Sequence, residues 1–136
     1  MSAMERSRLM ARVRQKHTSP ELFVRSVLHR AGLRFTVSGP LNASLPGRPD
    51  IVLPRRKTVV FVHGCFWHRH ENCPKATNPK TRKTFWSAKF RANRARDKRQ
   101  TKMLAQRGWR VLVVWECETV ESNRLALTRR LCRLLA

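Results

Sequence analysis

Potential metal ligands crowd into one short segment of this chain, and they constrain the fold more than any other feature. Residues 63–73 hold three histidines and two cysteines around an aromatic pair: His63, Cys65, Phe66, Trp67, His68, His70 and Cys73. Thiolate and imidazole are the ligands that a tetrahedral zinc ion prefers. Cys65, His70 and Cys73 are close enough in sequence to bind one ion, with its fourth position left open.

Cys117 is the candidate for that fourth position. It follows the apolar run 111–115, and the ligand-rich segment follows the apolar run 58–62. If these runs are neighbouring strands, their ends bring all four ligands together, and a structural zinc ion there stiffens the following loop. Free cysteines are often buried simply as apolar residues, but four candidate ligands favour a metal. His63 is an alternative to His70, and Cys132, in an apolar helical segment, is interpreted as structural.

The charge of the chain indicates its partner. With 30 Lys and Arg against 8 Asp and Glu, the formal net charge is +22 on 136 residues. No apolar stretch approaches the roughly 18 residues of a membrane-spanning helix, and the basic residues are distributed along the whole chain, so we expect no membrane association. Lys and Arg that neutralise phosphates release counterions and gain affinity, which favours nucleic acid. A ribosomal-type protein without an active site is the alternative.

Length and cysteine use narrow the class further. A chain with 41% hydrophobic residues can bury one core, so we expect a single domain over 18–136, preceded by a basic arm over 1–17 that lies on the nucleic acid. Met10 and Val13 would give this arm a short amphipathic helix. Metal binding explains the cysteines better than disulfides do, and no secretory signal is visible. We therefore expect a cytoplasmic, nucleoid-associated monomer.

The apolar pattern predicts helices alternating with strands. Thr18 supplies a helix cap, and the helix is expected to continue to about residue 31, before Gly32. Short strands are predicted at 35–37, 50–53 and 58–62, the last two as a hairpin, with a loop over 38–49. A long basic helix over 81–107, a buried strand over 109–115 and a helix over 123–135 follow. The predicted fold class is α/β, a mixed sheet flanked by helices.

Few acidic residues are present, so the position of each is informative. Asp50 follows a proline- and glycine-rich segment and begins a strand, where its carboxylate is a natural magnesium ligand, although aspartate is also a common turn residue. His68 titrates near neutral pH and is a candidate general base. Glu21 is placed to orient a histidine or to act only as a helix-start acid. Asp97, among basic residues on the long helix, is interpreted as forming surface ion pairs.

Several sequence blocks together resemble the very-short-patch repair endonuclease family, over a region from about Arg8 to the last helix. These blocks are Leu45-Pro46-Gly47-Arg48-Pro49-Asp50, His63-Gly64-Cys65-Phe66-Trp67-His68, Phe85-Trp86 and Gly108-Trp109-Arg110-Val111-Leu112-Val113-Val114-Trp115-Glu116-Cys117. The resemblance implies a DNA mismatch endonuclease with a restriction-endonuclease-like core. Such enzymes nick one strand just 5′ of the thymine in a T:G mismatch, the product of 5-methylcytosine deamination, and so initiate very-short-patch repair.

The same resemblance implies residue roles. Asp50 and the main-chain carbonyl of Val62 would bind the catalytic Mg²⁺, while His68 acts as general base with Glu21 in support. Structural Zn²⁺ would be held by Cys65, His70, Cys73 and Cys117. The DNA would be contacted by a wedge of Phe66, Trp67 and Trp86, by Lys89 and Asn93 at the wobble pair, and by Met10 in the minor groove.

The chain departs from the family at two places. Val62 stands where a threonine is usual, and the loop between Cys65 and Cys73 is one residue longer. Double-stranded DNA with a T:G mismatch is thus the expected partner, and repair proteins are further candidates. The rival hypothesis is a zinc-stabilised nucleic-acid-binding protein without catalysis. Both predict salt-sensitive binding, but only the enzyme predicts magnesium-dependent nicking.

Overall fold

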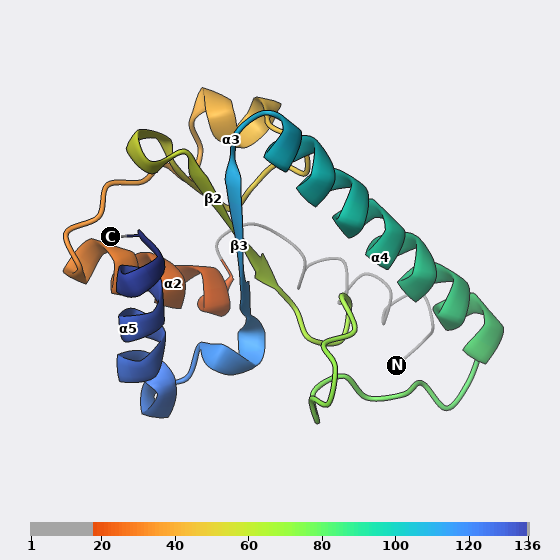
Figure 1. Cartoon of the computed structure of the whole chain (residues 1–136). Helices are drawn as coiled ribbons and strands as arrows, with labels where there is room; N and C mark the ends of the chain where they lie inside the picture. Colours follow the sequence, from red (N-terminus) through yellow and green to blue (C-terminus); the bar gives the residue numbers. More distant parts are fainter. Residues whose placement is uncertain (1–17, 136) are drawn as a thin grey trace.

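The structure is a computed structural model that describes residues 18–135 (Figure 1). Within this range the elements run in the order α2 (Ser19–Arg30), α3 (Pro40–Ser44), β1 (Ile51–Leu53), the 3-10 helix η1 (Pro54–Arg56), β2 (Thr58–His63), α4 (Lys83–Gln106), β3 (Arg110–Trp115), the 3-10 helices η2 (Glu116–Glu118) and η3 (Glu121–Asn123), and α5 (Arg124–Leu135). The predicted α/β class is confirmed. The basic arm and Met10 lie outside the described residues.

A three-stranded mixed sheet, in the order β1-β2-β3, forms the centre of the described fold. β1 and β2 make the predicted antiparallel hairpin, with Ile51 opposite Val60. β2 and β3 run parallel, with His63 opposite Trp115 at their ends. Because both strands end at the same edge, the segments that follow them start side by side. The expectation that the two apolar runs are neighbouring strands is thus confirmed.

Both faces of this sheet are covered. On one face, α2 and α5 pack against Ile51, Val60 and Val114, and Figure 1 shows the two helices together on that side. On the other face, the C-terminal part of α4 packs through Leu104 against a second cluster that includes Val59. Successive strand residues point to opposite faces. Val59 and Val60 are therefore both fully buried, in separate clusters.

Two predictions about the segment before β1 need correction. The strand expected at 35–37 is only a single bridge from Thr36 to Val52, because the chain then turns away from the sheet. Part of the expected loop is the helix α3, which is too short for a periodic apolar pattern. Its stability comes from Asn42, which is buried at 4% exposure and donates to the carbonyls of Thr36 and Pro49 at 3.0 and 3.1 Å.

The long helix α4 extends well beyond the sheet. Of its 24 residues only Phe90, Asn93 and Leu104 are buried, so most of its basic side chains face solvent. It ends before Gly108, which has a φ of +84°, as predicted. No helix among the described residues combines the length and the apolar character needed to cross a membrane.

Gly47 fixes the backbone that leads into Asp50. It has a φ of +79°, and a Cβ atom at this position would lie 3.0 Å from Cζ of Phe61 and 2.8 Å from the Gln100 side-chain oxygen. Gly32 has a similar φ of +76°, but a Cβ atom there meets nothing within 4 Å. The two glycines therefore share a backbone requirement, while only Gly47 also requires the absence of a side chain.

We predict that Gly47→Ala destabilises the protein more than Gly32→Ala does. The positive φ alone is expected to lower the free energy of unfolding by about 1–2 kcal/mol in each variant. In Gly47→Ala, overlap with the buried Phe61 ring is expected to lower the free energy of unfolding by about 1–3 kcal/mol more. Urea denaturation measures both, and equal losses in the two variants would contradict the steric argument.

Candidate active site and metal cluster

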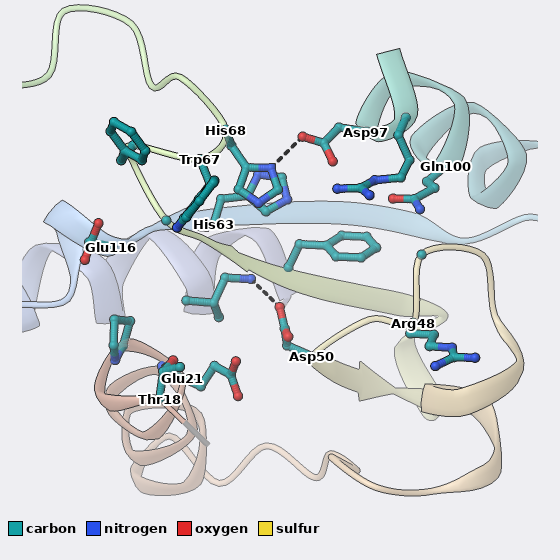
Figure 2. Close-up of a pocket in the computed structure, with 17 residues that line it drawn as sticks. Thr18, Glu21, Arg48, Asp50, His63, Trp67, His68, Asp97, Gln100 and Glu116 are labelled. Carbon is teal, nitrogen blue, oxygen red and sulfur yellow. Dashed lines mark hydrogen bonds and ion pairs between the residues drawn. The ribbon is translucent and has the colours of Figure 1, made fainter. Parts of the chain in front are cut away.

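The predicted catalytic residues line one cavity of 630 Å³, although they come from separate parts of the chain. Glu21 comes from α2, Asp50 directly precedes β1, Val62 belongs to β2, and His68 lies in the loop after β2. Figure 2 shows Glu21 and Asp50 on one side of this cavity and His68 on the other. The fold thus brings together the four residues that the sequence singled out for hydrolysis.

Asp50 is held against the backbone of β2 and is difficult to ionise. Its Oδ2 atom accepts a hydrogen bond of 2.7 Å from the Val62 N–H. Burial raises the pKa of Asp50 from 3.8 to about 6, against the lowering effect of the Val62 hydrogen bond, and the charge of Glu21 raises it further. A buried carboxylate beside a second acid is stabilised by a cation. These oxygen donors fit a hard divalent ion such as magnesium.

His68 pairs with an aspartate that the sequence analysis assigned another role. Its Nδ1 atom lies 2.6 Å from Oδ2 of Asp97 on α4, which corrects the expectation that Asp97 forms helix-surface ion pairs. The residues Phe90, Asp97 and Leu104 follow one another at intervals of seven, so all three share the helix face that packs on the protein. That spacing is the signal that identifies Asp97 as inward-facing.

The pairing with Asp97 fixes the histidine and keeps the carboxylate ionised. Burial alone would raise the pKa of Asp97, but the hydrogen bond and charge of His68 outweigh it, and the pKa lies below its ordinary value. The His63 ring stacks on the His68 ring, with centroids 3.8 Å apart and planes within 4°. Burial, together with the charge of His68, lowers the pKa of His63 to about 4. His63 is therefore neutral at pH 7.

Glu21 lies beside Asp50 within the same cavity. It is 8% exposed, its charge raises the pKa of Asp50, and its Oε2 atom lies 3.6 Å from an Arg25 nitrogen. Thr18 caps the helix here, accepting from the Glu21 N–H at 3.5 Å. The position next to Nδ1 of His68 is taken by Asp97. Support of His68 by Glu21 stays a prediction.

The four predicted zinc ligands converge at the edge where β2 and β3 end. The ligand atoms of Cys65, His70, Cys73 and Cys117 all lie within 4.8 Å of one another. Nδ1 of His70 is 3.7 Å from the Cys65 sulfur and 3.4 Å from the Cys117 sulfur. A tetrahedral zinc site has ligand-to-ligand distances of about 3.6–3.8 Å, so this donor set fits the ion.

The cluster also decides between the two candidate histidines. His63 groups instead with His68 and Asp97, so His70 is the imidazole of the cluster. Burial raises the pKa of Cys65 to about 12, and such a thiol becomes a ligand only when a metal displaces its proton. Trp115, the last residue of the strand predicted as buried, is half-buried, and its ring stacks on that of His70 with centroids 4.2 Å apart. Cys132 is exposed rather than part of a packed helix face.

An aromatic cluster joins the metal-bearing loop to the start of α4. The Phe66 ring lies 5.2 Å from Trp67, 5.6 Å from Trp86 and 5.2 Å from Phe90. Phe66 and Trp67 also line the cavity that holds the predicted catalytic residues. The three predicted wedge residues are therefore one unit at the margin of that cavity.

The residues predicted to contact the mismatch lie next to this aromatic cluster. Nζ of Lys89 is 5.3 Å from the Trp67 ring centroid. Asn93 is 5% exposed and donates its side-chain amide to the Trp67 carbonyl at 3.3 Å. In this structure Asn93 thus positions Trp67, and its contact with a base pair stays a prediction.

Arg69 is a structural residue that the sequence analysis missed. Its guanidinium carbon lies 4.3 Å from the Phe90 ring centroid. The same group donates to the Thr77 carbonyl and to the Asn78 side chain, each at 2.9 Å. Arg69 therefore fastens the later part of the loop to the aromatic cluster. A single arginine among many carries no distinguishing pattern in the sequence.

Comparison with known proteins agrees with this geometry. The family model described as DNA mismatch endonuclease Vsr matches residues 1–75. The chain is 50% identical over 135 residues to the type II nicking enzyme V.XorIIP of Xanthomonas oryzae pv. oryzae, with coverage of 99% of this chain and 95% of the relative. It is 43% identical over 129 residues to the DNA mismatch endonuclease Vsr of Escherichia coli, covering 93% of this chain and 80% of the relative. The chain therefore belongs to the DNA mismatch endonuclease Vsr family.

Proposed function

We propose that this protein is a DNA endonuclease that nicks one strand 5′ of the thymine in a T:G mismatch by magnesium-dependent hydrolysis and so initiates very-short-patch repair. The observation that carries the proposal is the cavity in which Asp50 faces the pair of His68 and Asp97. In this proposal residues 18–136 form a restriction-endonuclease-like domain, and residues 1–17 form an arm on the DNA.

Asp50 prepares the cavity for the scissile phosphate. Its carboxylate is fixed by the Val62 N–H, and we assign the Val62 carbonyl as the second main ligand of the cation. When bound there, magnesium supplies positive charge that stabilises the phosphodiester oxygens during in-line attack by water. Glu21, beside Asp50, adds negative charge that favours a cation at this site, and the same charge raises the pKa of Asp50.

His68 removes the proton from the attacking water. Since Nδ1 is held by Asp97, Nε2 is the nitrogen left to accept that proton. The water oxygen attacks phosphorus as its proton passes to Nε2, and the bond to the leaving sugar oxygen breaks, with that oxygen taking a proton from solvent. The imidazolium is stabilised by the ionised Asp97. The stacked and neutral His63 fixes the plane of the His68 ring without adding a competing charge.

The aromatic cluster supplies selectivity for the mismatch. Inserting Phe66, Trp67 and Trp86 between base pairs costs a few kcal/mol of stacking, and this cost is lower at a T:G wobble pair than at a sound pair. Lys89, Asn93 and Met10 are assigned to contacts with the wobble pair and the minor groove. A zinc ion in the Cys65 cluster would keep the loop rigid, so that the aromatic rings are already oriented for insertion.

The first test compares strand-labelled T:G and fully paired duplexes, with and without magnesium, for the wild type and for Asp50→Asn. We expect wild-type nicking only of the mismatched duplex and only with magnesium. Asp50→Asn is expected to lose nicking. Binding without nicking by the wild type under every condition would instead support the rival hypothesis of a non-catalytic nucleic-acid-binding protein.

Asp50→Asn is also expected to stabilise the metal-free protein. Since folding raises the pKa of Asp50 from 3.8 to about 6, the folded state binds more protons than the unfolded state between these values. The free energy of unfolding therefore falls as pH rises from 4 to 6, by about 1–3 kcal/mol from this group. In denaturation experiments at pH 7.5, the free energy of unfolding of the variant should exceed that of the wild type by a similar amount. An equal or lower stability of the variant would contradict the cost assigned to burial of the Asp50 carboxylate.

His68→Ala is expected to abolish nicking, and Asp97→Asn is expected to lower kcat by about 10²–10⁴-fold, because the neutral amide no longer stabilises the imidazolium. The affinity for the mismatched duplex should change by less than about threefold, since neither side chain belongs to the wedge. Lys98→Gln, an exposed neighbour on α4, is the control. A variant of His68 that cuts at the wild-type rate would refute the assignment of the general base.

Cys117→Ala is expected to lose bound zinc and to lower the melting temperature, because it removes the ligand that links the loop to the end of β3. Cys132→Ala is the control, since Cys132 is exposed and should leave zinc content and melting temperature unchanged. Elemental analysis of the purified proteins and thermal melts measure both effects. A wild type that is fully stable without zinc would contradict the structural role.

A further inference from the structure

A second groove, of 1020 Å³, lies on the other side of the aromatic cluster from the catalytic cavity. One wall is the loop over residues 69–79, and the other is the first half of α4. Trp86 and Phe90 line this groove, whereas Phe66 and Trp67 line the catalytic cavity. The rings of Phe66 and Trp86 are in contact at 5.6 Å, so the aromatic cluster separates the two hollows.

Cations without partners line the α4 wall of this groove. Lys83, Arg91 and Arg94 are exposed, and none of their side chains forms a hydrogen bond or an ion pair with another residue of the described range. Their spacing, with Ser87 between them, places them on one face of the helix. Arg69 also lines the groove, but its guanidinium is already used within the loop. Glu71 is the one acid among the described lining residues.

Such a row of like charges is unfavourable by itself and is stabilised by a polyanion. If the aromatic cluster enters the base stack at a mismatch, the duplex continues on both sides of the inserted rings. The arm that carries the scissile phosphate lies over the catalytic cavity. The other arm of the duplex then extends from the inserted rings on the side of the groove. There it faces the side chains of Lys83, Arg91 and Arg94.

We propose that this groove binds the sugar-phosphate backbone of the duplex arm that lies beyond the mismatch from the cut. The inference rests on the proposed function and deepens it by assigning the path of the DNA. Phosphate contacts of this kind fix the position of a protein on the duplex without reading its sequence. Lys83, Arg91 and Arg94 therefore determine affinity and register, while the rate of the hydrolytic step is set in the catalytic cavity.

The test compares two double variants with the same change in charge. Arg91→Gln/Arg94→Gln removes two groove cations, and Arg99→Gln/Lys102→Gln removes two exposed cations of the same helix that do not line the groove. Binding of a T:G duplex is measured without divalent metal over a series of salt concentrations. The plot of the logarithm of the binding constant against the logarithm of the salt concentration has a negative slope. The magnitude of this slope is expected to decrease by about two in the groove variant and by clearly less in the control.

Lys83→Gln gives an independent measurement at the other end of the groove, with an expected decrease in slope of about one. Single-turnover nicking at saturating enzyme should stay within about twofold of the wild type in the control variant Arg99→Gln/Lys102→Gln, whose two residues line neither the groove nor the catalytic cavity. Equal losses of slope in the groove and control variants would overturn the proposal, since they would show only a general charge effect.

The position of the bound arm is tested by shortening the duplex from either end. Removing base pairs from the arm beyond the mismatch should weaken wild-type binding to the level of the groove variant, whose own affinity should change little. If shortening the arm that contains the cut site has this effect instead, the assigned path of the DNA is wrong. Absence of nicking on every duplex would refute the proposed function separately, because the binding comparison requires no catalysis.

Discussion

The parallel pairing of β2 with β3 is the interaction on which both sites depend. It ends the two strands at one edge, with His63 opposite Trp115. Cys65 and Cys117 follow within two residues of these ends, which places two cysteine ligands together although they are far apart in sequence. The Cys65 N–H donates a hydrogen bond of 3.1 Å to the Glu116 side chain, which links the segments that follow the two strands. A shift of one residue in this register would separate the two cysteines.

The loop after β2 carries Phe66, Trp67 and His68 but has little regular secondary structure. Its order must therefore come from side-chain links, and each link reaches a different element. The Cys/His cluster connects it to the end of β3, the Asp97 pairing connects it to α4, and Arg69 connects its two halves. Under the proposed function this arrangement would present half-buried aromatic rings to DNA in positions that are already fixed, which would lower the entropy lost on binding.

The sequence predicted those features whose signal is local and periodic. The hairpin, the long helix and the last helix each occupy enough residues to show an apolar pattern, and the four cysteine and histidine ligands are distinctive by residue type alone. The helix α3 and Arg69 carry no such signal, because they depend on single hydrogen-bonding side chains. Asp97 was misassigned because its many basic neighbours indicated surface pairing, whereas its spacing from Phe90 and Leu104 determines where it points. Sequence patterns thus give the elements, and tertiary contacts choose between the roles of individual polar residues.

Asp50 and Asp97 illustrate how one cavity moves the pKa values of two carboxyl groups in opposite directions. Burial raises the pKa of Asp50, and the hydrogen bond and charge of His68 lower that of Asp97 in spite of partial burial. Asp97 is therefore ionised at neutral pH and keeps the His68 ring oriented. Under the proposed function a cation at Asp50 would compete with a proton, so that cation binding and deprotonation would be coupled at this group. Such a separation of pKa values assigns acid-base roles to otherwise identical side chains. In the proposed mechanism it separates Asp50, which would bind the cation, from Asp97, which would orient the general base His68.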